Sequence, residues 1–250
     1  MPTIDVAGEK IHAAFFDAKS DRNLVLVHGS GGDATCWPLA ELETLGVNVW
    51  SVDLPGHGQS GGKAREDVGE YAAVVEGLVK ALGLSRVYLG GHSLGSAVAL
   101  TLGLAAPAWL SGLVLVGAGA RLRVNPAIFE ALANDFSGAL TLMDSVIFGP
   151  AAPQNVREAM RLRMAKTDVS VMVSDFTACD RFDVMKDIRR ITLPALVVSG
   201  SAVVLTSLKY GRFLADNIPD AELVVLEGAG HMMALEQPGA FAGALARFLG

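Results

Sequence analysis

The stretch Tyr88-Leu89-Gly90-Gly91-His92-Ser93-Leu94-Gly95-Ser96-Ala97 decides the fold that the sequence predicts. An apolar run at residues 87–89 has the composition of a buried strand, and the small residues 96–106 favour a helix. Between them, residues 91–95 (GHSLG) fit the pattern G-x-S-x-G, in the strand–turn–helix context that presents a serine hydroxyl as a nucleophile. We therefore expect Ser93 to occupy a strained turn at the carboxyl edge of a sheet.

The pattern begins and ends with a glycine, and both glycines are required for steric reasons. Gly91 and Gly95 carry no side chain, so the strand and the helix can approach each other closely at the turn. The alternative interpretation is an ordinary glycine-rich turn, because the chain contains 28 glycines. The strand before the turn and the helix after it favour the first interpretation, in which Ser93 is a catalytic nucleophile.

The composition is that of a globular chain with a substantial core. Its 250 residues are enough for one large domain, or for one domain with an insertion, and 51% of them are hydrophobic. The formal net charge of −6 argues against a nucleic-acid partner. Two cysteines, Cys36 and Cys179, give no disulfide framework, and we expect both to be free buried thiols.

Neither a targeting segment nor a membrane span is visible in the sequence. Charged residues interrupt positions 1–20, where a secretory signal needs an apolar run. The longest weakly polar stretch, residues 94–110, is rich in small residues and contains Pro107, which does not fit a membrane-spanning helix. We therefore expect a soluble cytoplasmic protein with no membrane partner, and the sequence leaves its oligomeric state open.

Short apolar runs alternate with helical patterns along most of the chain, which predicts a parallel α/β sheet. A hairpin with its turn at Gly8-Glu9 is predicted over residues 3–17. Further strands are predicted at residues 24–27, 47–52, 87–89, 113–116, 193–200 and 222–226. Helices are predicted over residues 35–45, 68–82, 96–106, 206–217 and 238–249.

This alternation stops at Arg121. Residues 125–190 show helical periodicity without a strand, and three prolines divide them into three or four helices. Methionines and phenylalanines in this segment can line an adaptable apolar pocket, although plain helix packing explains any one of them. We expect residues 1–120 and 191–250 to form the core, and residues 121–190 to form a helical cap over the site.

Two loops that follow predicted strands contain further candidates. In His28-Gly29-Ser30-Gly31-Gly32, glycines leave backbone N–H groups free to face a ligand. The N–H of Ser30 is therefore a candidate for half of an oxyanion hole, and the alternative is an ordinary strand-to-helix loop. In the loop 53–60, we expect Asp53 to accept hydrogen bonds from the loop and His57 to brace the turn, rather than either to be catalytic.

Together with Gly228-Ala229-Gly230-His231, these motifs resemble the α/β-hydrolase fold family. They occur in the family's order, cover essentially the whole chain, and look closest to the small carboxylesterases and lipase-like hydrolases. The resemblance implies an eight-stranded, mostly parallel sheet with a helical cap inserted after the sixth strand. It also implies a small-molecule ester as substrate, and chemistry that needs neither a cofactor nor a metal.

The resemblance also implies roles for individual residues. Ser93 matches the family's nucleophile and His231 its general base, while the N–H groups of Ser30 and Leu94 match the oxyanion hole. A serine hydroxyl is a weak nucleophile until a base takes its proton, and a neutral imidazole suits that task near pH 7. Two N–H donors stabilise the tetrahedral oxyanion. The alternative for His231 is a structural loop histidine.

The family's catalytic acid is missing from its usual place. In the family pattern the acid follows the glycine that closes the seventh strand, and this chain has Val203 there. Some members place the acid after the sixth strand instead, but residues 117–121 contain no carboxylate. The acid orients the imidazole and stabilises its protonated form, and a valine can do neither.

Three hypotheses follow from Val203. The chain is a weakened esterase, natural or deliberately altered; or Glu227, Asp175 or Asp180 serves His231 instead; or the fold has become a binding module or receptor with little catalysis. We favour a serine esterase that cleaves small or medium carboxylic esters. Hydrolysis of thioesters, lactones or C–C bonds, and acyl transfer, remain open because the fold alone does not decide the reaction.

Overall fold

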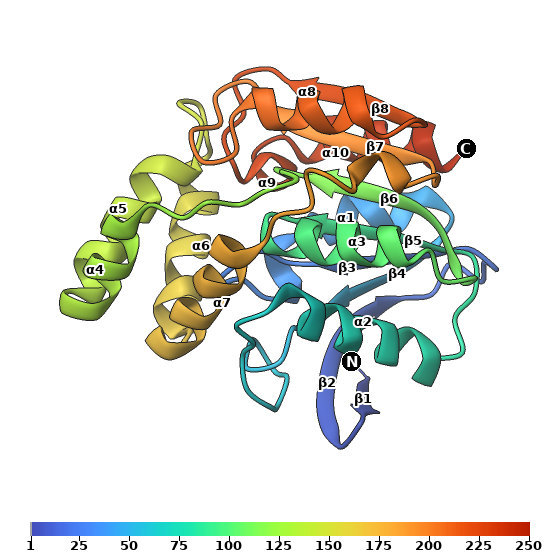
Figure 1. The fold of residues 1–250 in the computed structure, drawn as a ribbon, viewed down its shortest axis with the longest axis horizontal. Coiled ribbons are helices and arrows are strands. Elements are labelled where there is room, and N and C mark those ends of the chain that lie inside the picture. The colour runs from blue at the N-terminus through green and yellow to red at the C-terminus, as the bar shows by residue number, and fades with distance from the viewer. Residues whose placement is uncertain (1) are drawn as a thin grey trace.

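Eight strands form one sheet in the order β1-β2-β4-β3-β5-β6-β7-β8 (Figure 1). The computed structural model describes residues 2–250. The strands are β1 (Thr3–Val6), β2 (Glu9–Phe16), β3 (Asn23–Val27), β4 (Asn48–Val52), β5 (Val87–His92), β6 (Leu110–Val116), β7 (Ala195–Gly200) and β8 (Ala221–Leu226). β2 pairs antiparallel with β1 and β4, and all other pairs are parallel, which confirms the predicted mostly parallel sheet.

Helices cover both faces of this sheet. The central strand β3 is buried along its whole length, as expected of a parallel strand between two helical layers. Its alternate side chains divide between two apolar clusters: Val25 and Val27 face one layer, and Leu24 and Leu26 face the other. The first layer contains α2 (Val68–Ala81), α3 (Leu94–Ala105) and α8 (Leu208–Asn217). The second contains α1 (Leu39–Leu42), α9 (Met233–Glu236) and α10 (Pro238–Leu249).

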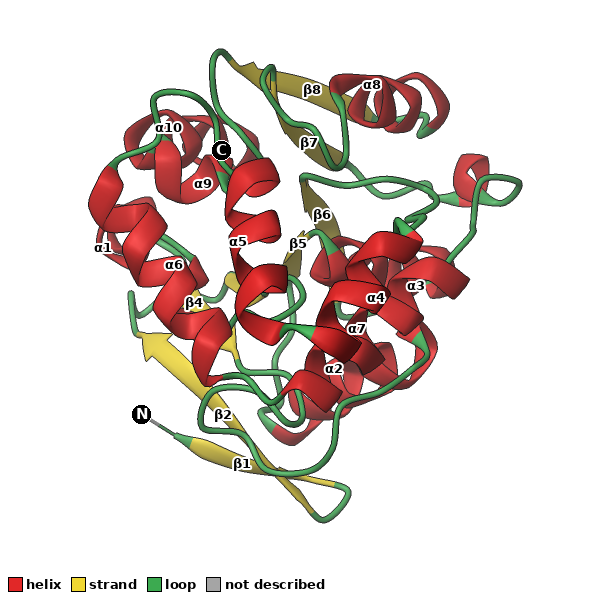
Figure 2. Cartoon of the chain, turned by 90° about the vertical axis from the view of Figure 1, so that its left-hand side faces the viewer, coloured by secondary structure: helices red, strands yellow, loops and turns green. Residues whose placement is uncertain are grey.

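Four helices lie between β6 and β7 in the sequence and form the predicted helical insertion. They are α4 (Pro126–Asn134), α5 (Phe136–Ile147), α6 (Gln154–Lys166) and α7 (Val169–Arg181). The insertion lies at the left of the sheet in Figure 1, and in Figure 2 it faces the viewer. Its helices share an apolar cluster rich in methionine, including Met143, Met160, Met164 and Met172, which also contains Met232 from the core.

Two local predictions near the N-terminus were wrong. Val6 pairs with Glu9, so the hairpin turns at Ala7 and Gly8, which both have positive φ, and not at Gly8-Glu9. The helix predicted over 35–45 is interrupted after a 3₁₀ turn at Ala34–Cys36. Pro38 disfavours helical backbone at the residue before it, and that residue is extended.

A third local prediction was wrong in a way that matters for the site. The helix predicted over 206–217 begins at Leu208, so Thr206 remains in the loop after β7. This loop runs beside the loop after β8, since the N–H of Ala202 donates to the carbonyl of Ala229 at 3.0 Å. Thr206 is therefore placed next to the loop that carries His231.

The two cysteines are free and buried, as predicted. Burial raises the pKa of each thiol to about 12, so neither forms a thiolate near neutral pH.

Among residues 2–250, no helix combines the length and the apolar character needed to cross a bilayer.

The close approach of β3, β5 and α3 depends on the two glycines that frame Ser93. A Cβ atom at Gly91 would lie 2.0 Å from the carbonyl oxygen of Gly95, and one at Gly95 would lie 2.1 Å from that of Val27. Both distances are far inside van der Waals contact. Only glycine allows this crossing of strand and helix.

Replacement of Gly95 by alanine tests this steric constraint. Because the new methyl group meets rigid backbone of β3, we expect Gly95→Ala to lower the free energy of unfolding by about 3 kcal/mol or more. The control is Gly243→Ala in α10, where the nearest atom is 3.9 Å away and alanine should stabilise by about 0.5–1 kcal/mol. Urea denaturation measures both, and equal effects would contradict the proposed constraint.

Candidate active site

Ser93 lies at the turn between β5 and α3 in a strained backbone conformation. Its φ of 53° and ψ of −113° fall where residues with a side chain are rarely found. A hydrogen bond stabilises this conformation, because the N–H of Ser93 donates to the carbonyl of Val116 in β6 at 3.0 Å. Ser93 is partly exposed and lines a cavity between the sheet edge and the insertion. This is the strand–turn–helix position that the sequence predicts for it.

His231 lies in the loop between β8 and α9 and lines the same cavity. The residue is only 4% exposed. Its backbone is held from two sides: its N–H donates to Ile147 of α5 at 2.7 Å, and its carbonyl accepts from Nε2 of His92 at 2.9 Å. The fold thus brings Ser93, which follows β5, and His231, which follows β8, to one cavity.

The ring of His231 has a hydroxyl partner where the family has a carboxylate. Its Nδ1 lies 3.1 Å from Oγ1 of Thr206, which is also buried. Val203, three residues earlier on the same loop, is 7% exposed and packs in an apolar cluster with Ala229 and Met233. The position expected for the acid is therefore part of the apolar core.

None of the three candidate replacement acids is hydrogen-bonded to His231 among residues 2–250. Asp175 is bonded to His57 and Tyr71, and Asp180 accepts from the N–H of Val124. Glu227 is exposed, and only its backbone carbonyl has a hydrogen-bond partner among residues 2–250. Within this part of the chain, no carboxylate reaches the imidazole of His231.

Burial governs the protonation of His231. Removal from water lowers the pKa of its imidazole well below the ordinary value of 6.5, and the neighbouring His92 lowers it further. The two rings lie 4.6 Å apart between centroids, and burial also lowers the pKa of His92 to about 4. His231 is therefore neutral at pH 7, the form in which an imidazole can accept a proton.

The loop after β3 packs directly against the nucleophile turn. A Cβ atom at Gly29 would lie 3.1 Å from Cβ of Ser93, so the two segments are in contact. Ser30 lines the cavity beside Ser93. Leu94 is the first residue of α3, and its N–H belongs to the group that a helix leaves without internal partners. Both predicted oxyanion donors thus belong to segments that meet at Ser93.

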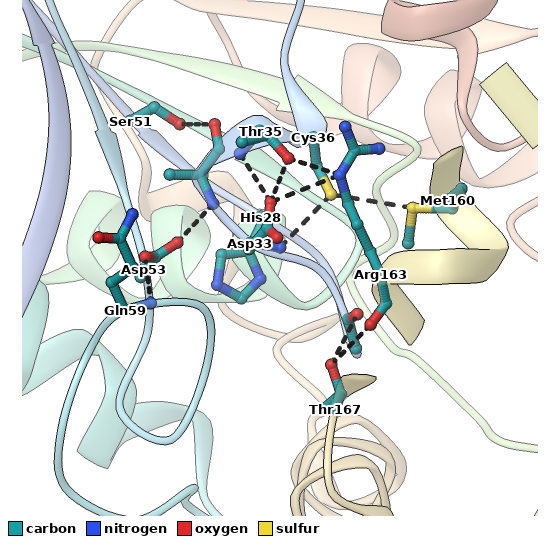
Figure 3. A network of polar contacts seen from close by, with 12 residues as sticks. His28, Asp33, Thr35, Cys36, Ser51, Asp53, Gln59, Met160, Arg163 and Thr167 are labelled. Carbon is teal, nitrogen blue, oxygen red and sulfur yellow. Dashed lines mark hydrogen bonds and ion pairs between the residues drawn. The ribbon is translucent and has the colours of Figure 1, made fainter. Parts of the chain in front are cut away.

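The insertion fixes this loop through a set of polar contacts (Figure 3). Arg163 of α6 contacts Thr35 and Asp33, and Sγ of Cys36 lies 3.8 Å from Sδ of Met160. The hydroxyl of Thr167 donates to the carbonyl of Gly31 at 3.3 Å. The loop that contains Ser30 is therefore bonded to the insertion as well as to the core.

Asp53 and His57 have the structural roles that the sequence predicts. Asp53 accepts from the N–H groups of Ala34 at 2.6 Å and Gln59 at 2.8 Å, and it contacts Nδ1 of His12 at 2.7 Å. Nδ1 of His57 lies 3.1 Å from the carbonyl of Pro55.

Two contacts were not predicted from the sequence: His57 also reaches the insertion through Asp175, and Thr206 contacts His231. The position of Thr206 three residues after Val203 was the one signal for the latter.

The cavity encloses about 410 Å³ and is mostly apolar. The insertion lines it with Leu142, Met143, Val146, Ile147, Met160, Met164 and Phe176, and the loop before α8 adds Val204 and Leu205. Its polar lining residues include Ser30, Ser93, Thr206 and His231, together with Arg121, Arg123, Asn125 and Tyr210. An apolar chamber with a few convergent polar groups is the usual form of a small-molecule site.

Proteins of known structure share this fold. A thermophilic esterase of known structure is 40% identical, with a TM-score of 0.88 over 99% of this chain and 96% of that one. A hydrolase from Pseudomonas aeruginosa PA01 is 28% identical, with a TM-score of 0.89 over 99% and 97% of the two chains.

A curated relative from Pseudomonas putida is the dihydrolipoyllysine-residue acetyltransferase component of an acetoin cleaving system. It is 33% identical over 85% of this chain, which spans 59% of that protein's length. The model of the alpha/beta hydrolase family matches residues 24–244. The chain therefore belongs to the alpha/beta hydrolase family.

Proposed function

We propose that this protein is a serine esterase that cleaves small or medium carboxylic esters, with Ser93 as nucleophile and His231 as general base. The observation that carries the proposal is that Ser93, in a strained turn, and a neutral His231 line one largely apolar cavity. The volume of about 410 Å³ suits an ester with apolar acyl or alkyl groups. The 40% identity to a thermophilic esterase supports the same reaction class.

The proposed reaction proceeds through an acyl-enzyme. Nε2 of His231 takes the proton from the hydroxyl of Ser93 as its oxygen attacks the ester carbonyl. The N–H groups of Ser30 and Leu94 stabilise the resulting oxyanion. The intermediate collapses with loss of the alcohol, which takes the proton from His231. Water, activated by His231, then attacks the acyl group, and the carboxylic acid is released as Ser93 regains its proton.

Thr206 is proposed to do part of the missing acid's work. If its oxygen accepts from Nδ1–H of His231, the lone pair lies on Nε2, which is the tautomer that a general base requires. A neutral hydroxyl cannot stabilise the imidazolium that forms during attack, however. In triad hydrolases, loss of a functional acid, which both sets the tautomer and stabilises the imidazolium, lowers kcat by about 10⁴-fold, equivalent to about 5–6 kcal/mol of barrier. We therefore propose a slow esterase.

A ligand-binding protein with the same pocket is the second candidate. The observation that favours it is Val203, which is packed into the apolar core where a triad hydrolase has its acid. This alternative leaves Ser93 and His231 without a purpose. Tight binding of a labelled apolar ester that is never cleaved, even after an acid is supplied at position 203, would favour it over the esterase.

Restoration of the acid tests the esterase proposal directly. We expect weak hydrolysis of a chromogenic short-chain ester by the parent and a gain of about 10³-fold or more in kcat for Val203→Asp, because a carboxylate stabilises the imidazolium. Val203→Asn is the matched control for shape without charge, and Ser93→Ala is the blank.

Two other outcomes of this comparison would change the account. A parent that is already fast, with no gain from Val203→Asp, would mean that the hydroxyl of Thr206 suffices for His231. Activity no higher than that of Ser93→Ala in both proteins would contradict the esterase proposal and leave ligand binding as the better interpretation.

The pH dependence of kcat/KM tests the state of His231. The base must be neutral, and its pKa is lowered well below 6.5, so activity should persist as the pH falls through 6.5 and decline only in more acidic solution. In Val203→Asp the carboxylate favours the protonated ring, so the acidic limb should move to higher pH. A parent whose activity is already half lost at pH 6.5, while circular dichroism shows it folded, would contradict the assignment.

A further inference from the structure

A fully buried carboxylate lies where the insertion meets the core. Asp175 of α7 is 0% exposed. Its Oδ2 accepts from the N–H of Gly31 at 3.1 Å and contacts Nε2 of His57 at 2.9 Å, and its Oδ1 accepts from the hydroxyl of Tyr71 at 2.6 Å. Three segments of the core thus converge on one side chain of the insertion.

The partner histidine is held in its charged form. Nδ1 of His57 faces the carbonyl of Pro55 and Nε2 faces Asp175, so both ring nitrogens meet acceptors. Only the imidazolium can donate from both nitrogens. Burial by itself lowers the pKa of His57, but the Asp175 carboxylate, together with the carbonyl of Pro55 and the charge of Asp53, raises that pKa above its ordinary value. Asp175 and His57 therefore form a buried ion pair.

Gly31, the third partner, follows the proposed oxyanion donor Ser30 directly. Its φ of +66° is a conformation that favours glycine, and a Cβ atom there would lie 3.3 Å from Cε of Met172 on α7. Its N–H donates to Asp175 and its carbonyl accepts from Thr167, so both backbone polar groups of Gly31 are hydrogen-bonded to the insertion. Rotation of the peptide between Ser30 and Gly31 would break the bond to Asp175.

Fold stability alone is a weak explanation for this arrangement. A buried ion pair often adds little to the free energy of unfolding, because both charges lose their hydration. An oxyanion hole, in contrast, works only when its donors are already aimed at the developing charge. The bond from Asp175 reaches the residue next to one such donor, while Sγ of Cys179, one turn further along α7, lies 3.7 Å from Oγ of Ser30.

We propose that Asp175 is a positioning residue for the oxyanion hole, holding the loop at residues 28–33 so that the N–H of Ser30 faces the reacting carbonyl. The insertion helix α7 then takes part in transition-state stabilisation as well as lining the pocket. This inference rests on the proposed esterase function. It gives Asp175 a role different from that of a replacement acid for His231.

Substitutions at Asp175 should affect kcat more than KM. Asp175→Ala removes the acceptor for Gly31, and we expect kcat to fall about 100-fold while KM changes by less than about threefold, because the hole acts mainly in the transition state. Asp175→Asn keeps one carbonyl oxygen for Gly31 and should retain more activity, with a loss of about tenfold. Asp175→Asn also carries the test if Asp175→Ala leaves His57 unpaired and fails to fold.

Tyr71→Phe provides the matched control. It removes one hydrogen bond from the same buried carboxylate, and the hydrogen bonds of the Tyr71 hydroxyl go to Asp175 and Arg65 and not to the loop 28–33. We expect a lower melting temperature and a kcat within about twofold of the parent. Equal losses of kcat in Tyr71→Phe and Asp175→Asn would overturn the proposal, because they would show a general effect of weakening the network.

Amide hydrogen exchange measures the loop without relying on catalysis. The N–H of Gly31 should be protected in the parent and in Tyr71→Phe, and should exchange at least about tenfold faster in Asp175→Ala and measurably faster in Asp175→Asn. Unchanged protection in folded Asp175 variants would overturn the proposal. If the parent shows no hydrolysis that depends on Ser93, the esterase function fails, and the exchange of Gly31 still decides whether Asp175 holds the loop.

Discussion

The crossing of β3, β5 and α3 at two glycines is the constraint on which the site depends. With backbone oxygens of Val27 and Gly95 only 2.0–2.1 Å from where Cβ atoms would stand, the chain can turn from strand to helix within one residue. Ser93 bears the strain of that turn, at φ 53°. The same turn places the first N–H groups of α3 beside the serine, so nucleophile and oxyanion donor come from one local feature.

The insertion is bonded to both halves of the proposed machinery. Its helix α5 accepts from the N–H groups of His231 and Met232 through the carbonyl of Ile147. Helix α7 holds the N–H of Gly31 through Asp175, and Thr167, which directly follows α6, holds its carbonyl. Glu236 adds a further link, since its Oε2 accepts from Gly149 and Gly230, on either side of the same junction. A change in the insertion can therefore alter the base and the oxyanion loop as well as the pocket.

Local patterns in the sequence were enough to predict the sheet, the helical insertion and the nucleophile turn. Buried parallel strands, helical periodicity and glycine-framed turns are properties of neighbouring residues. The absence of an acid at Val203 was also visible, because it concerns one position in one loop. The contact of Thr206 with His231 was not, since it joins two loops 25 residues apart and helical periodicity had placed Thr206 in α8. The sequence offers Asp175 as one candidate acid for His231, and its actual partners on three distant segments are set by tertiary packing, which local patterns do not predict.

Covalent labelling of the serine measures the central claim most directly, that His231 activates Ser93 with a hydroxyl in place of a carboxylate. A small alkyl fluorophosphonate phosphonylates an activated serine, and intact mass with peptide mapping locates and times the adduct. The account predicts a single adduct on Ser93, formed more slowly in Thr206→Val and at least about 100-fold more slowly in His231→Ala. No adduct on Ser93, or the same labelling rate in parent and His231→Ala, would contradict it.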